Sequence, residues 1–147
     1  MAVTQAFCTS FKTELLTGTH NLTAAANVLK LALFRATASI AGTFGAATTN
    51  YSNMGADEAT GTNYTAGGNA LTNITPVSSG TTALASFSNL VFTNVTIVAS
   101  GALIYNTSAA NRALVVLNFG ADKTATAADM TIIFPTADAS NAIIRLV

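Results

Sequence analysis

The single histidine and the single cysteine are the two residues of this chain that could begin nucleophilic chemistry. A hydrolytic triad needs a base held beside a nucleophile, and His20 lies in a Thr-His-Asn turn after a predicted helix. Cys8 lies on the apolar stripe of that helix, which favours a small buried hydrophobe over a reactive thiolate. We therefore predict no catalytic residue, and we expect His20→Ala to cost little stability.

The carboxylates show neither the spacing of a calcium-binding loop nor that of a glycosidase pair. They are Glu14, Asp57, Glu58, Asp122, Asp129 and Asp138. Asp57 and Glu58 are adjacent and remain a weak candidate for binding a cation. Gly67 and Gly68 supply turn geometry and not a phosphate-binding loop. The sequence thus predicts no metal site and no bound cofactor.

Aromatic residues leave one binding function open. Carbohydrate sites commonly use flat aromatic side chains that have an apolar body and a polar tip. The chain has no tryptophan, which weakens this interpretation, but Tyr51, Tyr64 and Tyr105 keep it as an alternative.

Charge and hydropathy exclude two classes of partner. Charged residues make up 8% of the 147-residue chain, and six basic side chains balance six acidic ones; an ordinary globular domain has about 25% charged residues. The basic residues are scattered, whereas a nucleic-acid-binding protein shows a basic patch or stripe. Apolar runs stay shorter than the 18 or so residues of a membrane-spanning helix. We expect neither nucleic acid nor membrane as a direct partner.

The longest apolar part of the chain predicts a central β-hairpin. Two strand-like runs, 102–105 and 113–119, flank the polar segment 106–111, whose Asn and Ser side chains favour a turn. Leu114 and Val116 point to one face of the second strand, while Val115 and Leu117 point to the other. Both faces are apolar, so we expect both to be covered and the rest of the chain to pack around this hairpin.

The first half of the chain predicts a helix, a strand and a long excursion. Apolar residues at four-residue spacing favour a helix over 4–16, with Gly18 at its C-terminal cap; it covers the sheet or forms an arm on a neighbouring subunit. Alternation over 28–35 favours a half-buried strand. The segment 37–68 is rich in small polar residues, with a possible helical turn at Asp57-Glu58. We interpret it as a surface excursion that contacts a partner.

Short strands at close spacing follow, at 69–77, 81–86, 90–92, 95–99, 130–134 and 142–147. This spacing is typical of all-β folds. We predict one mainly β domain over 1–147, an antiparallel β-sandwich or jelly-roll-like barrel with an N-terminal helix.

The predicted sheets have few residues that would protect their edges from pairing with other chains. Soluble proteins protect exposed strand edges with lysine, proline or covering loops, and this chain has three lysines and two prolines. So little charge also supports solubility poorly. We infer that other protein chains cover these edges, as in a homo-oligomer or a larger particle.

Four segments resemble small virion proteins of tailed bacteriophages. They are FCTSFKTELLTGTHNL (7–22), NYTAGGNALTN (63–73), GALIYNTSAANRALVVLNFGADKT (101–124) and FPTADASNAIIRLV (134–147). The resemblance implies a non-enzymatic structural protein of the virion, assembled in the host cytoplasm. Its most specific form is a capsid decoration or cement protein, often trimeric, that binds and stabilises the major capsid shell. The alternatives are a neck, tail or fibre component with a receptor- or glycan-binding role, and a hydrolase.

Overall fold

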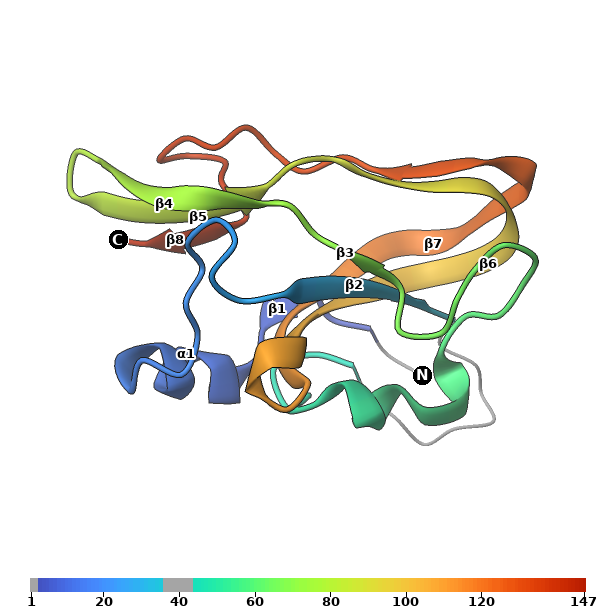
Figure 1. Ribbon diagram of the computed structural model, residues 1–147, viewed down its shortest axis with the longest axis horizontal. Helices are drawn as coiled ribbons and strands as arrows, with labels where there is room; N and C mark the ends of the chain where they lie inside the picture. Colours follow the sequence, from blue (N-terminus) through green and yellow to red (C-terminus); the bar gives the residue numbers. More distant parts are fainter. Residues whose placement is uncertain (1–2, 36–43) are drawn as a thin grey trace.

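The structure is a computed structural model that describes residues 3–35 and 44–147. It consists mainly of two antiparallel sheets with one short α-helix, as Figure 1 shows. The predicted β-sandwich is therefore confirmed. The sheets do not close into a barrel, because each has two edge strands.

The predicted hairpin is present and is longer than the sequence indicated. Strand β6 (Leu90–Asn106) pairs antiparallel with β7 (Arg112–Ile132), and the short 3-10 helix η2 (Thr107–Ala109) turns the chain between them. The predicted strands at 90–92, 95–99 and 102–105 are all parts of β6. Asn94, at φ 49°, lies where the register shifts, so this polar residue bends the strand without ending it.

The hairpin bends sharply, and Figure 1 shows it turning back on itself so that it runs through both layers. At the bend the register shifts between Ala99 and Gly101. A Cβ at Gly101 would lie 2.4 Å from the Leu117 carbonyl oxygen and 2.6 Å from the Phe34 ring. Only glycine lets the strands approach so closely, and Gly120 opposite adopts φ 77°.

The larger sheet is built on this hairpin in the order β1-β7-β6-β2-β3. Strand β2 (Leu29–Phe34) pairs with β6 on one side and with β3 (Asn69–Ala70) on the other. We predicted β2 to be half-buried, but both of its faces are covered. Ala32 and Phe34 are fully buried on the face expected to be open, and Phe34 packs against Phe44 at 4.5 Å between ring centroids.

The smaller sheet has the order β4-β5-β8. Its strands are β4 (Asn73–Ser79), β5 (Thr82–Phe87) and β8 (Ile144–Leu146). The single strand predicted over 69–77 was wrong, because the chain leaves the larger sheet after Ala70 and enters the smaller one at Asn73. The predicted strands at 113–119 and 130–134 are parts of the single strand β7, which ends at Ile132, and β8 covers only three residues of the strand predicted over 142–147.

The N-terminal helix begins later than predicted. Helix α1 spans Thr9–Leu16, and it is preceded by strand β1 (Ala6–Phe7). Residues 6–7 pair with Val115 and Val116 of β7, which supplies their backbone hydrogen bonds and overrides the helical spacing. Gly18 follows the helix at φ 72°, as expected for its C-terminal end. The helix packs on its own chain, with Phe11 1% exposed.

Residues 37–43 of the excursion lie outside the described residues. The remainder of the excursion packs against the rest of the fold. The 3-10 helix η1 (Tyr51–Asp57) begins at an Asn50 capping box and ends at the predicted Asp57-Glu58 turn. A Cβ at Gly61 would lie 1.9 Å from the Thr96 carbonyl oxygen, so this loop runs directly against β6. Met54 joins the core.

Leu117→Ala should lower the free energy of unfolding by about 2–5 kcal/mol, because it removes buried methyl groups and leaves a cavity in β7. Leu117 is 7% exposed, whereas Leu16 is 90% exposed and offers a matched control. Urea unfolding of Leu117→Ala and Leu16→Ala measures the difference. Equal stability of the two variants would contradict the central position of β7.

Candidate functional site

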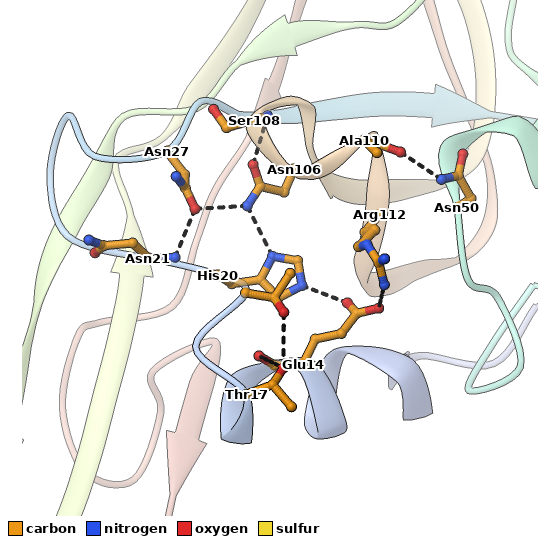
Figure 2. Close-up of polar contacts among 11 residues, drawn as sticks. Glu14, Thr17, His20, Asn21, Asn27, Asn50, Asn106, Ser108, Ala110 and Arg112 are labelled. Carbon is orange, nitrogen blue, oxygen red and sulfur yellow. Dashed lines mark hydrogen bonds and ion pairs between the residues drawn. The ribbon is translucent and has the colours of Figure 1, made fainter.

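The one histidine lies in a buried polar cluster that joins helix α1 to the central hairpin. The side chain of His20 is fully buried, and Figure 2 shows it between Glu14 and Asn106. Its Nε2 lies 2.6 Å from Glu14 Oε2, and its Nδ1 lies 3.0 Å from Asn106 Nδ2. Glu14 Oε1 also accepts a hydrogen bond from Arg112 Nη1 at 2.5 Å. Two segments far apart in sequence, 14–20 and 106–112, meet here.

The Asn106 amide determines which nitrogen of His20 carries the proton. The backbone N–H of Ser108 donates to Asn106 Oδ1 at 2.9 Å, so Nδ2 is the atom that faces His20. Nδ2 donates to His20 Nδ1 and also to Asn27 Oδ1 at 3.0 Å. His20 Nδ1 is therefore an acceptor, and its Nε2–H donates to Glu14. Both ring nitrogens are occupied, so the ring has no free lone pair for a substrate proton.

The charges in this cluster balance one another. Burial alone would raise the pKa of Glu14, but hydrogen bonds from His20 and Arg112, together with the Arg112 charge, hold this pKa below its usual value. The Glu14 side chain is 11% exposed, and a carboxylate this buried needs such partners. We infer that the cluster fastens α1 and the following loop onto the hairpin.

This arrangement corrects the expectation that His20→Ala costs little. Removing the ring would take one buried hydrogen bond from Glu14 Oε2 and one from Asn106 Nδ2, while the bonds of these residues to Arg112 and Asn27 remain, and a lost buried hydrogen bond costs about 1–3 kcal/mol. Cys8 agrees with its prediction, since it is fully buried. Burial, followed by the Glu14 charge, raises the pKa of the Cys8 thiol to about 12, so the thiol stays protonated at neutral pH.

The second candidate, Asp57-Glu58, is occupied by donors of the chain itself. The Glu58 carboxylate accepts hydrogen bonds from the Tyr51 and Tyr64 hydroxyls at 2.5 and 3.1 Å, and from the Gly67 N–H at 2.5 Å. Among the described residues, no group of three or more His, Cys, Asp or Glu side chains could hold a metal ion. The carboxylate instead joins the end of η1 to the turn at Gly67, within the excursion.

The three tyrosines proposed for a glycan site come together at this carboxylate. Tyr51 stacks on Tyr105 with 4.6 Å between ring centroids, and the Tyr105 hydroxyl donates to the Gly67 carbonyl at 2.7 Å. Burial, and then the Glu58 charge, raises the pKa of Tyr105 to about 12. Tyr105 is 3% exposed. Tyr51 and Tyr105 therefore stack on each other, and Tyr105 has little surface left for a sugar.

The other carboxylates are spread over the surface and do not form one site. Asp122 pairs with Arg35 at 3.5 Å, and both side chains are about half exposed. Asp129 accepts a hydrogen bond from the Asn94 N–H at 2.8 Å. Asp138 accepts hydrogen bonds from the Asn141 side-chain amide and from the backbone N–H groups of Ser140 and Asn141, and these bonds lower its pKa. Each carboxylate has a local partner.

An apolar groove lies between the end of α1 and the smaller sheet, at the end of the molecule where Figure 1 shows the C-terminus. Its volume is about 380 Å³, and none of its lining residues is an acid, a lysine or an arginine. Leu15, Leu22 and Pro76 line it together with Ile144 and Leu146 of β8. Leu146 is 58% exposed. The groove could not be predicted from the sequence, because its walls come from three separate parts of the chain.

Comparisons with protein families, with curated proteins and with solved structures find no match to this chain. Within the described residues, no helix is long and apolar enough to cross a membrane.

Acidification should weaken the Glu14 cluster in a defined direction. The folded-state pKa of Glu14 lies below the unfolded value of about 4.3, so its contribution to stability is present above that pH and is lost as the pH falls through the folded-state pKa. Glu14→Gln should be less stable than the wild type at pH 7, and this difference should shrink below about pH 4.

Urea unfolding of both proteins between neutral and acidic pH measures this difference. Asp122→Asn is the control, because an exposed ion pair stabilises little. A Glu14→Gln deficit that stays constant with pH would contradict the charged role of Glu14.

Proposed function

We propose that this chain is a non-enzymatic structural protein of a bacteriophage virion, most specifically a capsid decoration or cement protein that binds the major capsid shell. The observation that carries the proposal is the uncharged groove with its exposed apolar rim at the end of β8. Contiguous exposed apolar surface marks sites of protein contact. The resemblance of four segments to phage virion proteins supplies the setting.

The contacts of the candidate residues support a binding function over a catalytic one. Both nitrogens of His20 are used within the fold, Cys8 is buried, and the Glu58 carboxylate is used by tyrosines and a backbone N–H. These polar groups hold segments of the chain together. The groove, in contrast, has the 58% exposed side chain of Leu146 at its rim, available to a partner.

The mechanism would be thermodynamic. A protein that binds the assembled shell and not its separated subunits adds its binding free energy to the stability of the particle. Repetition over many equivalent sites would multiply this effect. The expectation of a trimer rests on the resemblance alone.

A tail, neck or fibre component is the second candidate, because it would use the same kind of apolar contact. Immunogold labelling of gradient-purified particles of the source phage, with an antibody raised against this chain, separates the two. Gold over the shell is the expected result. Gold at the tail tip would favour the alternative, and particles without label would contradict a virion function.

Attachment to the particle should survive high salt. The chain carries only 12 formal charges in 147 residues, and the groove lining includes no acid, lysine or arginine. In roughly 1 M NaCl the screening length falls to about 3 Å, which weakens exposed ion pairs and not apolar contacts. Co-sedimentation with shells should therefore persist in this salt and be lost in chaotropic denaturant.

The groove can be tested by substitution at its rim. Deletion of the N-terminal segment or of the excursion is unsuitable, because it would remove the core residues Phe11 or Met54. Leu146→Asp should weaken co-sedimentation, whereas Val91→Asp, at an exposed residue that does not line the groove, should not. Release by moderate salt, or equal binding of both variants, would contradict this interface.

A further inference from the structure

Among the described residues, the long strand β7 has one edge that is paired over only part of its length. On one side it pairs with β6 along its length, and on the other it pairs with β1 at Val115 and Val116. From Phe119 to Ile132, no backbone–backbone hydrogen bond joins this outer edge to another segment that the structure describes. An edge of this kind presents a row of N–H and C=O groups that another strand can pair with.

The edge lies beside a hollow on the described surface. β7 contains no proline, and from Phe119 onward its edge carries the charged side chains of Asp122, Lys123 and Asp129, a kink at Gly120, where φ is 77°, and a bulge at Ala127, where φ is 47°. The hollow has a volume of about 480 Å³ and includes Phe119, Ile132 and Ile133 in its lining. Ile133 is 75% exposed. An extended strand bound here would form hydrogen bonds with the backbone groups of the edge and place apolar side chains in the hollow.

The charges beside this edge favour one direction for a strand that pairs with it. Lys123 and Asp129 both line the hollow and lie on either side of Thr126. A second copy placed antiparallel about Thr126 brings the Lys123 end of each strand to the Asp129 end of the other, whereas a parallel copy brings like charges together. The chain has no net charge that would oppose self-association.

We propose that the outer edge of β7 is a homodimer interface, in which residues 119–132 of two copies pair antiparallel about a twofold axis near Thr126. The contact is isologous, so each copy supplies the same patch. The Ala127 bulge lies near the axis, and ladder bonds form on either side of it. Such a dimer does not rest on the virion function, and it differs from the trimer that the resemblance implies.

The mass of the purified protein tests this interface directly. Sedimentation equilibrium over a dilution series should give twice the 14.9 kDa mass of the chain at high concentration. Thr126→Lys places two lysines near the axis and should raise the dimer dissociation constant at least about tenfold. Thr13→Lys, at an exposed position of α1, makes the same change away from the edge and should leave the mass unchanged.

A charge exchange tests the antiparallel direction. Lys123→Glu should weaken the dimer, and adding Asp129→Lys in the same chain should restore it. Circular dichroism melts check that each variant folds, and hydrogen exchange should show concentration-dependent protection of amides in 119–132. The proposal would be overturned if the protein were a monomer at every concentration or a trimer. It would also be overturned if the Thr126→Lys variant dimerised as tightly as the wild type, or if the double variant Lys123→Glu/Asp129→Lys did not recover the dimer.

Discussion

The structure depends on one constraint: the part of the β6–β7 hairpin next to its turn, residues 101–105 and 113–117, is apolar on both faces and must be covered on both. Leu114 and Val116 face one way, Val115 and Leu117 face the other, and all four are buried. The hairpin meets part of this requirement by bending at Gly101, so that its two halves lie in different layers. Helix α1 and the smaller sheet complete the cover, while β2 pairs with the edge of β6 in the same sheet.

A buried and a half-buried carboxylate hold segments of the chain in place. Glu14 joins α1 to His20 and Arg112, and Glu58 joins the end of η1 to Tyr64 and Gly67. A chain with so few charges uses two of its six acids inside such contacts. The residues that the sequence offers as candidates for catalysis or metal binding therefore bind other residues of the fold, while the groove beside β8 is apolar.

The features predicted correctly were local ones. The hairpin was identified from two apolar runs and a polar turn, and the Gly18 helix end from one residue. Features that depend on distant partners were missed. Residues 6–7 form a strand because they pair with β7. Asn94 does not end β6 because it lies at a β-bulge, after which the strand continues. The His20 cluster needs Asn106, 86 residues away, and Asn106 showed only its turn-forming role in the sequence.

We propose that this protein acts through apolar contacts at the surface of a phage shell. A cryo-electron microscopy reconstruction of the source particle, at a resolution that allows the sandwich to be fitted, tests it most directly. The claim predicts that the fold occupies density on the shell, with the groove beside β8 facing a capsid subunit. A fold located at the tail tip, or shell density with the groove open to solvent, would contradict it.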